Sequence, residues 1–246
     1  MNNTQLWRAF GRNTLISILL FGALLGLLWL VEYISSLMGR SGGVSLLHWS
    51  DPSWVVGIPA SIIGVAYILT VRDPNNYTGF YAGIVMSALL GVQFILQRQY
   101  DSAVLYYAVF IPFQVLSIVN WRKPKTESDA PFVPEYLSFR QRGVTLLIAA
   151  LIVAADDLLC TYVFQHNAIT DNIAVKLFNG LLIASSVFAN YWLIYRKIDA
   201  WFFWVAYSFA GIALFILIGN IFSIVLFSFF LVINSMAGIA WIRLRK

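Results

Sequence analysis

The sequence predicts an all-α polytopic membrane protein, and three observations lead to that fold class. Of the 246 residues, 60% are hydrophobic and 11% are charged, whereas a soluble domain carries about 25% charged residues. The apolar residues form long unbroken runs, several of them near the roughly 20 residues that cross the hydrocarbon core of a bilayer. The runs show no strand-like alternation, which favours helices over a membrane β-barrel.

The first apolar run, residues 14–38, predicts a retained transmembrane helix that follows a short polar segment with Arg8 and Arg12. The run is longer than the core of a signal peptide and lacks a convincing cleavage site. Gly22 and Gly26 give this helix a small-residue face that can pack closely on another helix.

Seven further transmembrane helices are predicted along the rest of the chain. They cover residues 54–71, 77–97, 102–121, 143–164, 172–195, 200–218 and 222–242. The connections between them are short, apart from residues 122–142. That stretch is polar and contains Pro124, Pro131 and Pro134, so it is predicted to be a surface linker.

Basic residues are distributed unequally between the two sides of this eight-helix topology. Arg40, Arg98 and Lys176 fall on one side. The other 13 of the 16 Lys and Arg residues fall on the side that holds both termini, namely Arg8, Arg12, Arg72, Arg122, Lys123, Lys125, Arg140, Arg142, Arg196, Lys197, Arg243, Arg245 and Lys246. Because cytoplasmic loops are enriched in Lys and Arg, the bias predicts that both termini are cytoplasmic.

Two similar sequences end the third helix of each half of the chain and indicate an internal repeat. Gln114 lies seven residues before Trp121, Asn234 lies seven residues before Trp241, and basic residues follow each tryptophan. A single helix between the two sets of three makes the sets run in parallel. Parallel repeats are a transporter architecture, with the binding site between the halves near the middle of the membrane.

The predicted organisation therefore has four parts. They are an extra N-terminal helix and loop (residues 1–45), a first three-helix bundle (46–122), a polar linker with a linker helix (123–168) and a second three-helix bundle (169–246).

Aromatic, hydroxyl and amide side chains within apolar segments are the candidate substrate-binding residues. Trp201, Trp204 and Ser208 share one face of a helix, where two rings and a hydroxyl can hold an aromatic, hydroxylated small molecule. Taken alone, this local pattern favours an aromatic belt at the membrane surface, and the rest of the chain shifts the interpretation towards a site. Trp121 and Trp241 are interpreted as anchors of helix ends at the inner interface. The candidate substrate-binding set is Trp201, Trp204, Ser208, Gln114, Asn234, Gln93, Asn179 and Asn190.

The candidate amides have an alternative role, because each can hydrogen-bond between helices without touching a ligand. Pro112 is the candidate gating residue, because a proline bends its helix.

Asp156 and Asp157 within an apolar segment suggest either an ion site or a helix that emerges early on the outer face. The second interpretation is favoured because both acids lie on the linker helix, outside the two bundles.

Enzyme, metal and cofactor sites find little support in the sequence. There is no G-x-x-x-x-G-K-[ST] phosphate loop, and His48 and His166 lie in separate loops without metal-ligand spacing. No catalytic residue, metal site, cofactor or nucleic-acid partner is predicted. A membrane-embedded enzyme acting on lipid-like substrates and a structural or sensor protein remain alternatives, but neither explains the repeat and the paired amides.

The sequence resembles the PnuC family of bacterial vitamin transporters over residues 46–246. The pieces that carry the resemblance are Asn76-Tyr77, Tyr100-Asp101-Ser102-Ala103-Val104-Leu105, Pro112-Phe113-Gln114, Asn120-Trp121, Asp171, Trp201-x-x-Trp204, Gly219-Asn220 and the stretch from Asn234 to Trp241. The resemblance implies a SWEET-like arrangement of three helices, a linker helix and three helices, to which some members add an N-terminal helix.

The resemblance also implies a function in NAD biosynthesis. It implies uptake of nicotinamide riboside through the bacterial cytoplasmic membrane by facilitated diffusion, with trapping by a cytoplasmic kinase. The expected partners are this small molecule and the lipid bilayer, and a homo-oligomer is left open. The family motif Trp-x-x-Trp-x-x-x-Asn ends here in Ser208. A hydroxyl offers fewer donors than an amide, so another vitamin or nucleoside, such as thiamine, riboflavin or a deoxynucleoside, is the alternative substrate.

Overall fold

All the regular structure in the described part of the chain is helical, as predicted. The computed structural model describes residues 3–37, 52–97, 99–122, 133–162 and 172–245. His48, His166 and Asp171 lie outside these ranges. Six of the described helices are long and apolar enough to cross a membrane, and the apolar part of a seventh, Val55–Val71, is shorter. The prediction of an all-α polytopic membrane protein is confirmed.

The first three-helix set contains α2 (Pro52–Val71), α3 (Gly79–Leu96) and a long helix with a break in its regularity. That helix consists of α4 (Tyr100–Leu105), the π-helical turn η1 (Tyr106–Phe110) and α5 (Ile111–Trp121). Asn76 makes the turn between α2 and α3, because its Oδ1 accepts hydrogen bonds from the backbone N of Thr78 at 3.0 Å and from its Oγ1 at 2.6 Å.

The second set contains α7 (Ile173–Ile194), α8 (Asp199–Leu217) and α9 (Ile221–Leu244). Asn220 caps α9 by accepting a hydrogen bond from the backbone N of Ser223 at 3.0 Å. Gly219 precedes it with a φ of 74°, a left-handed conformation that glycine adopts without strain. The Gly219-Asn220 pair therefore builds the tight turn between α8 and α9.

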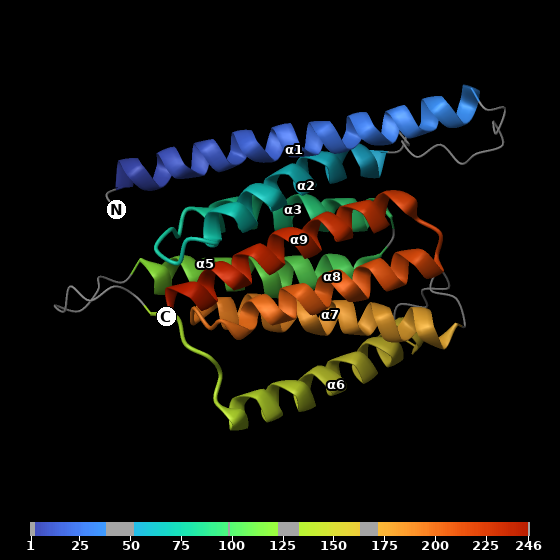
Figure 1. The fold of residues 1–246 in the computed structure, drawn as a ribbon. Coiled ribbons are helices and arrows are strands. Elements are labelled where there is room, and N and C mark those ends of the chain that lie inside the picture. The colour runs from blue at the N-terminus through green and yellow to red at the C-terminus, as the bar shows by residue number, and fades with distance from the viewer. Residues whose placement is uncertain (1–2, 38–51, 98, 123–132, 163–171, 246) are drawn as a thin grey trace.

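The linker helix α6 (Phe139–Tyr162) packs on α7 and stands apart from the other helices (Figure 1). It begins four residues before its predicted start at residue 143. The backbone N of Ser138 donates to Gln141 Oε1 at 2.9 Å, and the backbone N of Gln141 donates to Ser138 Oγ at 3.3 Å. This reciprocal pair is a capping box, a signal present in the sequence Ser138-x-x-Gln141 that the apolar pattern alone does not reveal.

Both acidic residues of α6 have partners on α7. Asp156 Oδ2 accepts a hydrogen bond from Asn179 Nδ2 at 3.0 Å, and Asp157 lies 3.0 Å from Lys176 Nζ. The Asp157–Lys176 pair is partly exposed. These contacts join the linker helix to the second set of helices.

The N-terminal helix α1 (Asn3–Leu37) lies across the first set on the side away from α6 (Figure 1). Asn13 Nδ2 donates to the backbone O of Leu69 at 3.2 Å, and Ser17 Oγ donates to the backbone O of Ile62. A Cβ added at Gly22 or Gly26 would meet no described atom within 4 Å. The small-residue face of α1 is therefore uncovered by the rest of the described chain.

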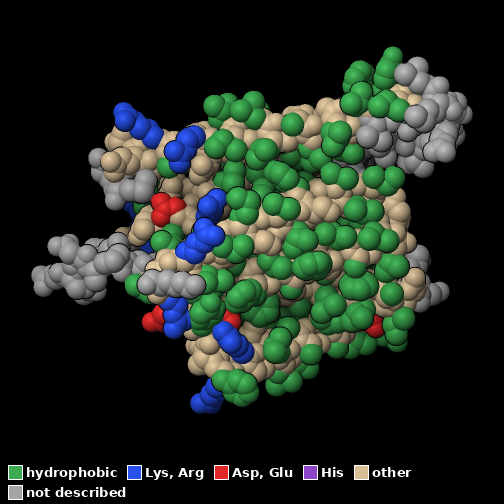
Figure 2. All heavy atoms as spheres, in the orientation of Figure 1, with side chains coloured by type: hydrophobic (Ala, Val, Ile, Leu, Met, Phe, Trp, Pro, Cys, Tyr) green, Lys and Arg blue, Asp and Glu red, His purple; other side chains and the backbone are tan. Residues whose placement is uncertain are grey.

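The two ends of the bundle differ in charge. The N- and C-termini lie at the same end (Figure 1), and Lys and Arg side chains gather there (Figure 2). We call this the basic end. The helices α2 and α7 both run towards it, as do α5 and α9, so the two sets run in the same direction.

Candidate functional site

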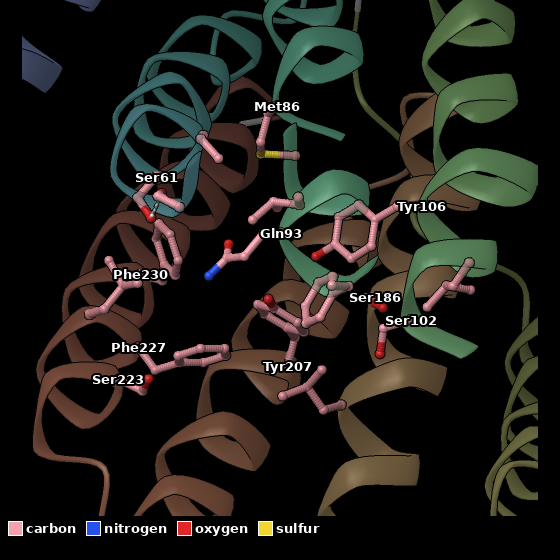
Figure 3. Close-up of a pocket in the computed structure, with 18 of the residues that line it drawn as sticks. Ser61, Met86, Gln93, Ser102, Tyr106, Ser186, Tyr207, Ser223, Phe227 and Phe230 are labelled. Atoms are coloured by element: carbon pink, nitrogen blue, oxygen red, sulfur yellow. Dashed lines mark hydrogen bonds between the residues drawn. The ribbon is translucent and has the colours of Figure 1, made fainter. Parts of the chain in front are cut away.

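A cavity of about 490 Å³ lies between the two three-helix sets. Both sets contribute side chains to its wall, and the close-up in Figure 3 shows aromatic, amide and hydroxyl groups around it. Small-molecule sites in proteins usually measure about 300–1,000 Å³, so the cavity has room for a nucleoside-sized ligand. It extends from Gln97 and Asn220, at the end opposite the basic end, to Gln114, Asn190 and Asn234.

A hydrogen bond between Gln114 and Asn190 joins the two sets at the deep end of the cavity. Gln114 Nε2 donates to Asn190 Oδ1 at 2.9 Å and lies 3.5 Å from Tyr67 Oη. Gln114 is 1% exposed and Asn190 is 4% exposed. Gly83 makes room for the amide, because a Cβ there would lie 2.7 Å from Gln114 Oε1.

Asn234 occupies the corresponding position on α9, and Ser208 holds it. Asn234 Nδ2 donates to Ser208 Oγ at 3.1 Å and to the backbone O of Trp204 at 3.3 Å. Ser208 Oγ donates to the same Trp204 carbonyl at 2.9 Å. The residue that departs from the family motif is therefore a neighbour of a cavity residue.

Aromatic rings line the cavity, and two of them, Tyr106 and Tyr207, come from different helix sets (Figure 3). Tyr207 packs on Trp204, with ring centroids 5.4 Å apart at 88°, and on Phe227, with centroids 5.1 Å apart. Such rings can hold a flat ligand by stacking and edge contacts. Gln93 also points into this space (Figure 3).

The π-helical turn brings Tyr106 to the cavity. Pro112 has no backbone N–H to donate to residue 108, so the regular α-helical pattern is interrupted just before it. Residues eight apart on a regular α-helix differ by about 80° in direction, whereas residues seven apart share a face. The wider turn takes up one extra residue, and Tyr106 therefore faces the cavity with Gln114.

An aromatic cluster closes the bundle between the cavity and the basic end. It consists of Phe80, Trp121, Trp201 and Trp241, which are all buried. The rings of Phe80 and Trp121 meet edge to face at 4.7 Å, and Trp201 meets Trp241 in the same way at 5.6 Å. Trp121 and Trp241 thus lie in the core and not on the lipid-facing surface that an interfacial anchor occupies, which corrects that expectation. Each indole N–H donates to a backbone carbonyl at or just after a helix end.

The structure brings most of the predicted site residues together. The residues that line the cavity are Trp204, Gln114, Asn234, Gln93, Asn179 and Asn190. Trp201 belongs to the aromatic cluster, and Ser208 lies behind Asn234, so neither lines the cavity. Pro112 follows the π-helical turn. Contact of any of these residues with a substrate stays a prediction.

Sequence reasoning missed the tyrosines at positions 67, 106 and 207. A signal was available, because a tyrosine within a membrane helix needs a partner for its hydroxyl. The cavity-lining phenylalanines at 227 and 230 gave no such signal, since an apolar residue in an apolar helix does not reveal which side it faces.

No Asp, Glu, Lys, Arg or His is found among the described residues that line the cavity. The carboxylate of Asp156 approaches it through Asn179, whose side chain lies between them. The described part of the wall therefore offers hydrogen bonds and ring faces, and no charged side chain.

Comparisons with known proteins agree with this architecture. The sequence model of the family described as "Nicotinamide mononucleotide transporter" matches residues 54–243. The chain belongs to this transporter family. It is therefore a transporter of the PnuC type, and the family assignment argues against the enzyme alternative.

A solved structure has the same fold. It is described as "Crystal structure of the Vitamin B3 transporter PnuC", and its alignment covers 97% of each chain with a TM-score of 0.63 at 15% sequence identity. No curated protein sequence matches. The match of the family model confirms the predicted family, and the solved structure confirms the predicted fold. At 15% identity, the structural match supports the fold and nothing more specific.

Proposed function

We propose that the protein carries nicotinamide riboside into the cell by facilitated diffusion and that a cytoplasmic kinase traps it by phosphorylation. Nicotinamide riboside has a flat cationic ring, a carboxamide and ribose hydroxyls. Trp204 lines the cavity, and an indole face attracts a cationic ring by about 0.5–2 kcal/mol. Amides and tyrosine hydroxyls in the same wall supply hydrogen-bond partners for the carboxamide and the sugar.

The lack of charged side chains among the described residues of the cavity wall is the observation that carries this proposal. A phosphate group brings about −1.5 to −2 charges at neutral pH and is bound by cationic groups. The cavity-lining residues that the structure describes include no Lys or Arg, so a phosphate there would lose its hydration without a counter-charge. The riboside fits this wall better than the mononucleotide in the family's description. A product phosphorylated in the cytoplasm would then be unable to leave.

The proposed location is the bacterial cytoplasmic membrane, with both termini in the cytoplasm. The gathering of Lys and Arg at the end that holds both termini supports this orientation (Figure 2). The cavity then lies in the outer half of the protein, and the aromatic cluster separates it from the cytoplasm.

Binding of a small panel of ligands to the purified protein, measured by calorimetry, tests the substrate. The panel contains nicotinamide riboside, its 5′-phosphate, thiamine, riboflavin and an uncharged nucleoside. We expect the riboside to bind and its phosphate not to bind. Equal binding of the phosphate would contradict the argument from the uncharged wall.

A different vitamin is the second candidate, and Ser208 is the observation that favours it. The family motif has an asparagine at this position, and the hydroxyl here is used in hydrogen bonds to Trp204 and Asn234. If thiamine or riboflavin binds and the riboside does not, the departure at Ser208 marks a change of specificity within the same fold.

Transport into liposomes tests the mechanism. Without a kinase and without an imposed gradient or membrane potential, internal riboside should rise to the external concentration and no higher. Gln114→Ala and Asn234→Ala should slow this uptake at unchanged protein abundance. Ser228→Ala is a control, because Ser228 donates to the backbone O of Ile224 at 2.8 Å and is not a cavity-lining residue. Normal uptake by both amide variants would contradict the proposed site.

A further inference from the structure

The orientation of the Gln114 amide is set by a chain of hydrogen bonds that ends on the backbone. Asn190 Nδ2 donates to the backbone O of Ser186 at 2.9 Å, which turns Asn190 Oδ1 towards Gln114. That oxygen can only accept, so Gln114 must present its Nε2–H group to it, at 2.9 Å. The carbonyl Oε1 of Gln114 is consequently the atom left over.

The orientation of the Asn234 amide is set in the same way. Ser208 Oγ uses its only hydrogen in the bond to the backbone O of Trp204, so it can only accept from Asn234. Asn234 Nδ2 donates to that hydroxyl and to the Trp204 carbonyl. Here too the amide nitrogen is used inside the protein, and the carbonyl Oδ1 is left over.

Neither of these two carbonyl oxygens accepts a hydrogen bond from any residue that the structure describes. Gln114 is 1% exposed, Asn234 is fully buried, and both residues line the cavity. A buried polar atom without a partner costs about 1–3 kcal/mol, so native proteins retain few of them. Two such atoms of the same kind at corresponding positions of the two helix sets indicate a shared requirement for a donor.

We propose that Asn190 and Ser208 are positioning residues that hold these two amides so that each turns its carbonyl oxygen, and not its NH₂ group, to the ligand at the deep end of the cavity. We call this pair of oxygens, Gln114 Oε1 and Asn234 Oδ1, the acceptor pair. The inference rests on the proposed function in that the cavity is taken as the substrate site. It adds the polarity of the ligand group bound at the deep end.

The acceptor pair selects ligands by the polarity of the group that reaches it. A group with N–H or O–H donors gains one or two hydrogen bonds there. A carboxylate or a bare carbonyl would face two oxygens that can only accept. No cationic side chain among the described lining residues would offset the resulting repulsion. On nicotinamide riboside, the donor is either the carboxamide NH₂ or a ribose hydroxyl.

Two analogues of nicotinamide riboside distinguish these donors. Nicotinic acid riboside replaces the carboxamide by a carboxylate, and 2′,3′-dideoxy nicotinamide riboside lacks the ribose donors. Calorimetry on the wild-type protein should show that one of the two binds about ten-fold or more weakly than the parent riboside. The analogue that loses affinity identifies which end of the ligand lies deep.

Variants of the positioning residues test whether the acceptor pair causes this discrimination. Ser208→Ala removes one of the two acceptors of Asn234 Nδ2 and leaves the Trp204 carbonyl, so the amide is held less firmly and can turn its NH₂ group to the ligand. Asn190→Ala removes the Asn190 Oδ1 acceptor and leaves Gln114 Nε2 only the longer contact with Tyr67 Oη. We expect either variant to shrink the ratio of affinities between the riboside and the weaker analogue, whereas loss of fold would abolish all binding. Ser228→Ala, which removes a serine bonded to a helix carbonyl in the same way, should leave the ratio unchanged.

The outcomes separate this inference from the proposed function. Similar binding of the riboside and both analogues, or an affinity ratio that neither variant alters, would overturn the acceptor pair while leaving riboside transport intact. Binding of another panel member in place of the riboside would overturn the proposed substrate, and the same comparison would be made with analogues of that ligand. A wild-type protein that binds no panel member would overturn both.

Discussion

Trp121 and Trp241 connect the two helix sets through their indole nitrogens. Trp121 Nε1 donates to the backbone O of Leu193, near the end of α7, at 3.1 Å, and Trp241 Nε1 donates to the backbone O of Arg72, just after α2, at 2.7 Å. Each tryptophan lies at or near the end of the third helix of one set and bonds to the end of the first helix of the other set. The contacts are therefore related by the internal repeat, and they satisfy carbonyls that helix ends leave unpaired.

Replacement of Trp241 by phenylalanine tests the value of this contact. Trp241→Phe keeps an aromatic ring in the cluster and removes the donor to Arg72, so the free energy of unfolding should fall by about 1–3 kcal/mol. Thermal or denaturant unfolding in detergent measures the loss. The matched control is Trp192→Phe, because Trp192 Nε1 is buried and has no partner among the described residues. An equal loss in both variants would show that ring size, and not the hydrogen bond, matters.

Glu135 gives a prediction for the dependence of stability on pH. The hydrogen bond from Lys197 Nζ, at 2.7 Å, and the charge of that lysine hold the pKa of Glu135 below its ordinary value of 4.5. The ionised carboxylate is favoured in the folded state. Its contribution to stability is therefore complete above pH 4.5 and is lost as the pH falls through the lowered pKa.

The magnitude of this effect is small, because the Glu135 side chain is 73% exposed. An exposed ion pair contributes about 0–1 kcal/mol. Glu135→Gln should therefore lower the unfolding midpoint slightly at neutral pH and not at all in acid below the lowered pKa. A difference between the two proteins that persists unchanged into acid would contradict the assignment to this ion pair.

Pro112 and the π-helical turn η1 show how one residue changes a whole helix. The turn adds a residue between the α4 and α5 portions, so that side chains before it are rotated relative to those after it. No corresponding break is present in α9, where Phe227 and Asn234 are seven residues apart and both line the cavity. The two helix sets thus each place an aromatic ring and an amide in the cavity wall, although their third helices differ in sequence and in regularity.

Pro112→Ala restores a backbone donor and should allow the helix to become regular. Tyr106 would then turn away from the cavity by about 100°, the angle of one residue. We expect weaker binding of the transported ligand with little loss of stability, measured by calorimetry and by unfolding of the same preparation. Ile111→Ala is the control, because it removes a neighbouring side chain without adding a donor. Unchanged binding in Pro112→Ala would mean that the turn persists without the proline.

The whole molecule is two helix sets that run in the same direction, with α6 between them in sequence and outside them in space. Besides the packing of α6 on α7, the start of the linker is tied to α8 by charge and hydrogen bonding, since Arg142 Nε lies 2.8 Å from Asp199 Oδ1 and the backbone N of Leu137 donates to Asp199 Oδ2 at 2.8 Å. Asp199 is buried, and its two partners come from the first turn of α6 and from the segment just before it.

The proposed orientation predicts the location of both termini. A fluorescent protein that folds only in the cytoplasm should be fluorescent when fused after Lys246, and alkaline phosphatase fused there should be inactive. A fusion after residue 40, between α1 and α2 in the sequence, should give the opposite result if α1 crosses the membrane once as proposed. Activity of the phosphatase at the C-terminus would reverse the orientation of the proposed cavity.

The sequence by itself determined the fold class, the side on which basic residues gather and the family, and it placed seven of the predicted helices to within four residues. These properties depend on local hydrophobicity, on charge and on short motifs such as Gly219-Asn220, which act without distant partners. The first helix begins at Asn3, 11 residues before its predicted start at residue 14, because its polar N-terminal turns continue the helix that the apolar run alone defines. Six of the eight candidate substrate-binding residues also line the cavity, since a polar side chain in an apolar helix needs a wet or polar neighbour.

Only the tertiary structure decided which of those side chains face the cavity and what they bond to. The π-helical turn directs Tyr106 inwards, Asn190 meets Gln114 from 76 residues away, and Ser208 holds Asn234 from 26 residues away. Helix register and rotation result from packing between helices, and several rotations bury an apolar segment equally well. The amide orientations follow from those contacts, and no local pattern in the sequence could specify them.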